Sequence, residues 1–407
     1  MNIQPYRSPD QFWPPKMTPW WFFCADFLRT RALRQQQIVE LEVRGLEFLQ
    51  ASLDARAGVL IAPNHSFHWD SYCLLEAARK TRCPFYFMTA WQVFHQSNWF
   101  DRMSMQRCGC FSVDREGTDM QSMKTAIDIL QNRPHPLVIF PEGDVYHTND
   151  CITPFREGAA SIALMAARKA ERDVVVHPVA IKRWYLQDPI ESLKETLSKL
   201  ETRLYWAPKS HAPITDRILR LADGLLSLKE LEHFQTTRTG PLPQRIRSLA
   251  NDVLVEVEGR YGIAAKDTLL PERVKEVRRK IIQQQTEDAP TLSAEQQHQL
   301  AVDMDTMFFV TQLYSYPGDY VSRKPSRDRI AETVDKFEED VLGAPYPSVR
   351  GPKRAVVQFG PAIALPRGKD KKLSPSELTM QMQSAVQSML DGLNQEFDAT
   401  HPQASGQ

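Results

Sequence analysis

The sequence lacks three features that would direct a chain to nucleic acid, through a membrane or out of the cell. Its 50 lysines and arginines balance 50 aspartates and glutamates, and binding nucleic acid needs a basic excess on some face. Apolar runs stay well short of the roughly 18 residues of a spanning helix. The first residues also lack the basic-then-apolar pattern of a signal peptide. We therefore expect a cytoplasmic protein that is neither exported nor integral to a membrane.

Cysteine is scarce and shows no metal-binding spacing. The six cysteines are scattered, and the pair Cys108 and Cys110 has no second pair to complete a zinc site. We expect buried thiols in a reducing compartment.

Aromatic residues and proline are abundant in residues 1–39, which we interpret as an N-terminal arm. Trp20 and Trp21 lie near the cations Lys16 and Arg29, a combination that suits an anchor lying flat in the headgroup layer of a membrane. An arm whose aromatic residues pack onto the domain is the alternative, and the sequence leaves both open. A helical period then runs through residues 31–53.

Residues 40–185 contain alternating strand-like and helical stretches, which predict the core of the protein. Apolar strand segments are expected at 58–62, 85–88, 111–113, 137–140 and 174–176. Continuous apolar strands separated by helices imply an α/β fold with a mostly parallel sheet flanked by helices. In such sheets the chemistry gathers at the carboxyl ends of the strands.

The second half of the chain changes character. Residues 186–349 predict long amphipathic helices, at about 189–204, 214–234, 241–260, 271–285 and 293–313. Strand character returns at 355–361, and a final helix is expected at about 375–394. We interpret 186–349 as a large helical insertion and 350–395 as the closing strand and helix of the core. A separate C-terminal domain is the alternative, and residues 396–407 are expected to be a disordered tail.

The first chemical motif is a histidine five residues before an aspartate, directly after a buried strand. The ring N–H of His65 can donate to the carboxylate of Asp70, which fixes the histidine tautomer and stabilises the imidazolium formed when the other nitrogen takes a proton. His68 and His65 together would supply half a metal site, but no third ligand at matching spacing is evident. We expect no metal.

Three further segments follow the other predicted strands in order. Arg115 stands just past one strand, where it could clamp an anionic group. Glu142 and Gly143 follow the next strand, and His177 lies in the last one. Each segment alone is compatible with a structural role. Their joint occurrence favours a site.

The four blocks, 64–70, 109–115, 140–143 and 177–179, resemble those of the glycerolipid acyltransferase family, which includes lysophosphatidate and glycerol-3-phosphate acyltransferases. The resemblance covers about 40–183 and 353–394. It implies that His65 is the general base, that Asp70 orients it, and that Arg115, Glu142 and Gly143 bind the acceptor. It also implies an acyl-CoA or acyl-carrier-protein donor, a glycerolipid or other alcohol acceptor, and no cofactor.

Two departures from the family pattern bear on the acceptor. Asp144 follows the third block where the family usually has threonine and arginine, and Thr89 and Ala90 stand where a lysine is common. Both missing cations are ones that the family uses near the phosphate of the acceptor. Possible replacements are three cations, Arg156, Lys182 and Arg183. We therefore do not expect lysophosphatidate as the acceptor.

The resemblance and the motifs together predict direct acyl transfer without a covalent enzyme intermediate, by a protein peripheral to the cytoplasmic face of a membrane. Two alternatives remain at this stage. One is a non-catalytic lipid-binding or scaffolding protein on the same fold. The other is a hydrolase that uses the same base to cleave acyl thioesters.

Overall fold

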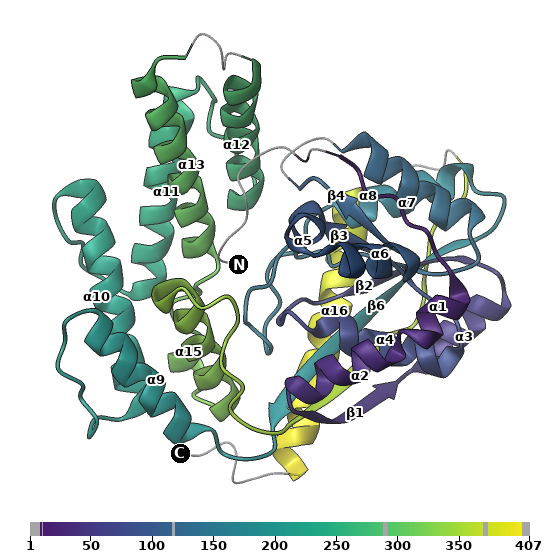
Figure 1. Ribbon diagram of the computed structural model, residues 1–407, viewed down its shortest axis with the longest axis horizontal. Helices are drawn as coiled ribbons and strands as arrows, with labels where there is room; N and C mark the ends of the chain where they lie inside the picture. The colour runs from purple at the N-terminus through teal and green to yellow at the C-terminus, as the bar shows by residue number, and fades with distance from the viewer. Residues whose placement is uncertain (1–8, 10, 116–118, 288–291, 369–372, 401–407) are drawn as a thin grey trace.

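A computed structural model describes residues 9, 11–115, 119–287, 292–368 and 373–400. One eight-stranded, mostly parallel sheet is covered by helices on both faces, and a group of long helices stands to one side of it (Figure 1). The prediction of an α/β fold with an extra helical region is confirmed.

The sheet has the strand order β1-β7-β6-β2-β5-β3-β4, with β8 pairing to β6. Most neighbours are parallel, whereas β6 is antiparallel to β7 and β8. The strands are β1 (Ile38–Arg44), β2 (Gly58–Pro63), β3 (Tyr86–Ala90), β4 (Cys110–Val113), β5 (Leu137–Val138), β6 (Val174–Tyr185), β7 (Lys353–Phe359) and β8 (Ile363–Ala364).

Each face of the sheet has its own apolar core, because successive side chains of a strand point to opposite faces. In β2, Leu60 packs with α7 (Met120–Asn132), α8 (Gly158–Lys169) and α16 (Pro375–Thr400). Ile61 packs on the other face with α3 (Leu46–Asp54) and α4 (Asp70–Thr81). The strand is buried along its whole length, so it reads as one apolar run.

The helical region consists of α9 to α15, which follow β6 and precede β7 in the chain. Their bounds are α9 (Ile190–Arg203), α10 (Ile214–Phe234), α11 (Leu242–Arg260), α12 (Leu270–Glu287), α13 (Ala294–Tyr314), α14 (Tyr320–Arg323) and α15 (Arg327–Leu342). One cluster of apolar side chains holds together the four helices α10, α11, α12 and α13. Another cluster packs α9, α10 and α15 against the end of β6. After these helices the chain returns to the main sheet as β7, between β1 and β6.

The arm contains two helices, α1 (Pro19–Cys24) and α2 (Asp26–Gln35). Two other short helices, α5 (Trp91–Gln96) and α6 (Trp99–Arg107), lie between β3 and β4 in the chain. Phe22 and Leu33 of the arm are buried in the sheet core, while Trp20 and Phe27 are 61% and 62% exposed. The arm therefore both packs on the domain and presents aromatic side chains to the outside. Across the described part of the chain, no helix combines the length and the apolar character needed to cross a bilayer.

Three expectations about local structure are wrong. The helical period expected over 31–53 is interrupted by strand β1, whose Leu41 and Val43 alternate with Glu40 and Glu42 in the manner of a strand. The helix α16 continues to Thr400, so residues 396–400 are not a disordered tail, and residues 401–407 lie outside the described residues. The last strand of the parallel series runs to Tyr185, well past 176, because its second half pairs with β7.

The six cysteines are all free thiols, but they are not all buried. Cys73, on the inner face of α4, is buried in the core, and burial raises its pKa to about 12. Cys24 is exposed, and the other four are half-buried. The expectation of buried thiols therefore fails for Cys24, which lies in the arm.

Candidate active site

The loop between β2 and α4 brings the predicted histidine and aspartate together. The Nδ1 atom of His65 lies 3.2 Å from Oδ2 of Asp70. The Asp70 side chain is fully buried, whereas that of His65 is 19% exposed and lines a large cleft. Nδ1 donates to the carboxylate in this arrangement, which leaves Nε2 as the nitrogen that can take a proton.

Asp70 also shapes the loop that carries the histidine. Its Oδ2 accepts hydrogen bonds of 2.8 Å from the backbone N–H groups of Ser66 and Phe67. The Nε atom of Arg183 lies 3.9 Å from the other carboxylate oxygen, and its guanidinium stacks 3.8 Å above the ring of Phe67. The carboxylate is thus fixed by the backbone on one side and faces a cation on the other.

Glu142 fixes the backbone of His65 through a hydrogen bond. One carboxylate oxygen accepts from the N–H of His65 at 2.6 Å, and the other accepts from the N–H of Thr153 at 3.0 Å. Burial raises the pKa of Glu142 to about 8, although the two N–H groups act in the opposite direction. Because Glu142 does not line the cleft, the structure gives it a positioning role in place of the acceptor contact that the resemblance implies.

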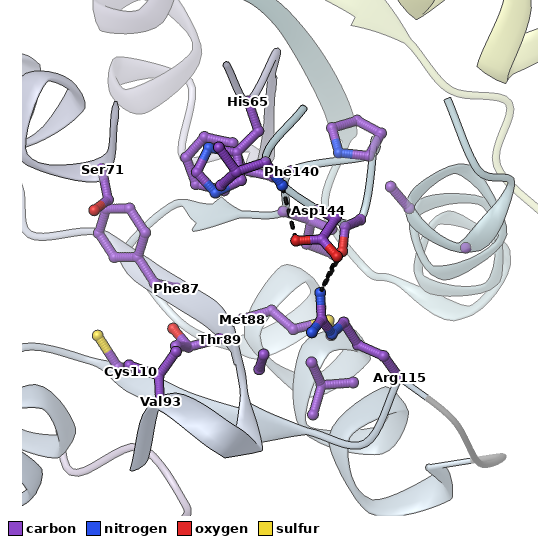
Figure 2. Close-up of a pocket in the computed structure, with 18 of the residues that line it drawn as sticks. His65, Ser71, Phe87, Met88, Thr89, Val93, Cys110, Arg115, Phe140 and Asp144 are labelled. Atoms are coloured by element: carbon purple, nitrogen blue, oxygen red, sulfur yellow. Dashed lines mark hydrogen bonds and ion pairs between the residues drawn. The ribbon is translucent and has the colours of Figure 1, made fainter. Parts of the chain in front are cut away.

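The ring of His65 stacks on Phe140, with the two centroids 4.1 Å apart. In Figure 2 the two stacked rings overlap. Together with the hydrogen bond to Asp70, this stacking restricts both the tilt and the rotation of the imidazole. An imidazole held in this way needs little reorganisation before it can accept a proton.

Arg115 lies across the cleft from the histidine, where it contacts the third motif (Figure 2). Its Nη1 donates to the carbonyl oxygen of Gly143 at 2.7 Å and lies 3.5 Å from Oδ2 of Asp144. Burial raises the pKa of Asp144, but Arg115 above all, with smaller contributions that include the N–H of Val145 and then Arg156, lowers the pKa overall. Asp144 therefore offsets part of the positive charge that Arg115 brings to the cleft.

Of the three cations considered as replacements, only Arg156 lines the cleft. It packs over Gly143, which has a φ of +80° and where a Cβ atom would lie 2.8 Å from Nε of the arginine. Lys182 is buried and paired with Asp150. Arg183 lies behind Asp70, as described above.

The cleft has a volume of about 2100 Å³ and extends from the arm to the first turn of α12. Its lining includes apolar side chains from the arm, α4, β3, α6 and α8, among them Phe23, Leu28, Leu75, Phe87, Met105 and Ile162. The same lining carries charged side chains, among them Asp26, Arg79, Arg115, Asp144, Arg156 and Lys275. A site of this kind can hold an aliphatic chain and a polar group together.

The histidine of the fourth block lies inside the sheet rather than at the cleft. His177 is fully buried. Its Nε2 lies 2.9 Å from Oγ of Ser52, and its Nδ1 lies 3.0 Å from the carbonyl oxygen of Gly360. It therefore links β6 to α3 and to the residue that follows β7.

Sequence reasoning missed Arg183 and Phe140 as supports of the site. The aromatic residue is visible in the third block, but nothing in the sequence shows that its ring faces the histidine. Arg183 is 113 positions after Asp70 by number (183 − 70), and only the pairing of β6 with β2 brings its strand beside the loop. Among the described residues, His68, His147 and Glu339 form a group with the donor types of a metal site.

Residues 40–182 match the family model described as Acyltransferase. The matched region contains the histidine–aspartate pair, the third motif and nearly the whole parallel part of the sheet. The match covers less than half of the chain, and it marks this region as an acyltransferase domain. It supports the predicted resemblance to the glycerolipid acyltransferase family. No curated protein matches the chain.

Proposed function

We propose that the protein transfers a fatty acyl group from an acyl thioester, acyl-CoA or acyl-carrier protein, to a hydroxyl of a glycerolipid-type acceptor. The observation that carries this proposal is the fixed imidazole of His65. Its Nδ1 is held by Asp70, and its ring borders a cleft lined by both apolar and charged side chains. A general base is needed because a hydroxyl is a weak nucleophile until its proton is removed.

In the proposed mechanism, Nε2 of His65 takes the proton of the acceptor hydroxyl as the oxygen attacks the thioester carbonyl carbon. The tetrahedral intermediate then expels the thiolate, and the imidazolium returns the proton to sulfur. Asp70 keeps the proton of Nδ1 in place and stabilises the imidazolium. Donors in the cleft wall stabilise the oxyanion. Two cationic side chains of this wall are Arg115, which ends the second motif, and Arg156, which packs over Gly143 of the third.

The charges of the cleft favour an acceptor with a small net charge. Arg115 is partly neutralised by Asp144, with 3.5 Å between the charged groups. Arg156 lies 3.9 Å from a carboxylate oxygen of Glu272. A phosphate monoester carries nearly two negative charges at neutral pH, which these pairs balance poorly. We propose a lysophospholipid with a zwitterionic headgroup, or a neutral alcohol, in preference to lysophosphatidate.

We also propose that the protein works as a peripheral protein on the cytoplasmic face of a membrane. Exposed aromatic side chains on α1, α2 and α6 support this, namely Trp20, Phe23, Phe27, Trp99 and Phe100. Trp21 joins α1 to α6 through its contact with Phe100, with ring centroids 6.3 Å apart. Phe23 also lines the cleft, so an acyl chain could pass from the bilayer to the site. Aromatic side chains favour the interface of a bilayer.

Flotation with liposomes tests the membrane proposal. Replacing Trp20, Phe27 and Trp99 together by serine should strongly reduce flotation. Tyr205→Ser, at a residue that is 96% exposed in the helical region, is the matched control and should float like the wild type. Equal flotation of all three proteins would refute the proposal.

Activity is tested with labelled acyl-CoA and acyl-carrier protein, and with lysophospholipids and simple alcohols as acceptors. The wild type and His298→Ala, a change at an exposed histidine of α13, should form a labelled ester. His65→Ala should form it at least about 100-fold more slowly. Equal rates for the wild type and His65→Ala would refute the role of His65.

The pairing of Arg115 with Asp144 favours one alternative, a lipid-binding protein that no longer transfers acyl groups. The same assay separates the possibilities by product. Release of free fatty acid in place of ester would identify a hydrolase. Lipid binding without any product in the wild type would support the binding protein.

A further inference from the structure

Two histidines and a glutamate from three distant segments meet beside the active site. His68 lies in the loop before α4, His147 in the loop after the third motif, and Glu339 on α15 of the helical region. One oxygen of Glu339 lies 2.9 Å from Nε2 of His68, and the other lies 3.2 Å from Nε2 of His147. The donor atoms of all three lie within 4.8 Å of one another.

The group is built into the interior of the protein. His147 and Glu339 are almost completely buried, and His68 is half-buried. Neutral imidazole and ionised carboxylate are the forms that bind a metal ion.

We propose that His68, His147 and Glu339 bind a divalent transition-metal ion, with Zn²⁺ as the best fit. Zinc–nitrogen and zinc–oxygen bonds of about 2.0–2.2 Å place the ligand atoms of a tetrahedral site roughly 3.4 Å apart. The two measured spacings from the glutamate, 2.9 and 3.2 Å, are close to this value. Two imidazoles disfavour Mg²⁺ and Ca²⁺, which prefer oxygen ligands.

The loop that carries His147 is held in place before any ion binds. His147 has a φ of +54°, in the left-handed region, which residues other than glycine rarely adopt. Two residues later, the Asn149 side chain donates to the carbonyl oxygen of Arg183 at 2.7 Å and accepts from its N–H at 3.1 Å. A fixed loop reduces the entropy lost when the ligand atoms converge on a metal.

The metal would connect the helical region to both loops that form the active site. His68 is three residues from His65, and the N–H of Tyr146, next to His147, donates to the carbonyl oxygen of His65 at 3.4 Å. Because His68 also lines the cleft, an ion has a path to the site. The proposed ion therefore acts as a clamp between α15 and the loops around the general base.

Calorimetric titration of the chelator-treated, full-length protein with ZnCl₂ tests the proposal without using activity. The wild type should bind one zinc ion at this site. Glu339→Gln, which keeps the size of the side chain and a hydrogen bond, should weaken that binding at least about 100-fold, since even the loss of a supporting residue costs 10–100-fold. His298→Ala should bind zinc like the wild type.

Cobalt separates this site from the cysteines. Co²⁺ added to the wild type should give visible d–d absorption without the thiolate charge-transfer band that binding at Cys108 and Cys110 would produce, and Glu339→Gln should lose the visible bands. Zinc binding that is absent in the wild type, or unchanged in a Glu339→Gln variant with a native circular dichroism spectrum, would overturn the proposal. The group would then be a hydrogen-bonded cluster only. These outcomes do not depend on acyl transfer.

Discussion

The acyltransferase core and the helical region use buried charge in different ways. In the core, the carboxylates of Asp70 and Glu142 accept hydrogen bonds from backbone N–H groups of the loop that carries His65. In the helical region, buried glutamates pair with arginines of neighbouring helices, as Glu201 does with Arg217 and Glu230 with Arg245. The first arrangement fixes a loop conformation, and the second fixes which helices lie together.

The difference shows where each region is sensitive. A loop carboxylate controls the position of one catalytic group, so its loss should affect turnover most. A helix-pairing glutamate leaves a buried arginine behind when it is removed, so its loss should affect folding most. The distinction would fail if a loop carboxylate variant lost mainly folding stability, or if a helix-pairing glutamate variant lost mainly turnover.

The largest expected effect is that of Asp70→Asn on turnover. An asparagine oxygen can still accept from the N–H groups of Ser66 and Phe67, but the side chain no longer stabilises the imidazolium of His65. We expect kcat to fall about 10²–10⁴-fold, while the free energy of unfolding changes little. Initial rates with labelled acyl donor, together with urea denaturation, measure both. A kcat within twofold of wild type would contradict the role assigned to Asp70.

The second prediction concerns the stability effect of replacing Glu201, a helix-pairing glutamate. Its carboxylate lies 2.8 Å from Nη2 of Arg217, and both side chains are almost completely buried. Glu201→Gln should lower the free energy of unfolding by about 3–5 kcal/mol, because the arginine keeps its charge without a counterion. The double variant Glu201→Leu with Arg217→Met should recover most of this loss. If the single and double variants are equally stable in urea denaturation, the pairing argument fails.

A smaller effect is expected for Glu142→Gln. The amide has one acceptor oxygen, so its NH₂ group must face the N–H of either His65 or Thr153. An unsatisfied buried donor costs about 1–3 kcal/mol, and kcat should fall because the backbone of the base shifts. Urea denaturation and initial rates measure the two effects. Glu195→Gln, at an exposed site of α9, should change neither, and a fully active, equally stable Glu142→Gln would refute the positioning role.

The last prediction concerns the pH dependence of stability and Lys353, which lies where the core meets α15. Burial first, and then Arg183, lowers its pKa from 10.5 to about 8. Between pH 8 and 10.5 the unfolded chain therefore binds more protons here than the folded one, so this lysine makes stability increase with pH, by at most about 1.4 kcal/mol per pH unit. Urea midpoints across this range should rise less for Lys353→Met than for the wild type. Parallel profiles would refute the lowered pKa.

Much of the core could be predicted because local patterns there agree with the final contacts. The strand before His65 is apolar throughout and is buried throughout, and the predicted helices α9 to α13 follow from clear apolar periods. Strand β1 was missed because Ile38 and Leu41, three residues apart, also fit a helical period. Its partner, β7, lies more than 300 residues further along the chain, so no local signal decides between the two.

The polar contacts of the site were harder to predict, because the partners come from distant segments. Acidic residues of α15, among them Asp335 and Glu339, resemble a solvated helix face in sequence, yet they are buried against the core. Glu339 reaches His68 across 271 positions. Pairing of this kind depends on the packing of α15, which spacing alone does not reveal.

The place of β7 has a consequence for how the chain is made. Strand β1 has a single neighbour in the sheet, β7, and 309 positions of chain separate their facing ends (353 − 44). At about 5–20 residues per second, a ribosome needs roughly 15–60 s to cover that distance. During this time the helices α9 to α15 emerge while β1 still has no partner. The sheet of the enzyme is therefore completed only after the helical region has left the ribosome, and the stability of that region governs how long the incomplete edge must wait.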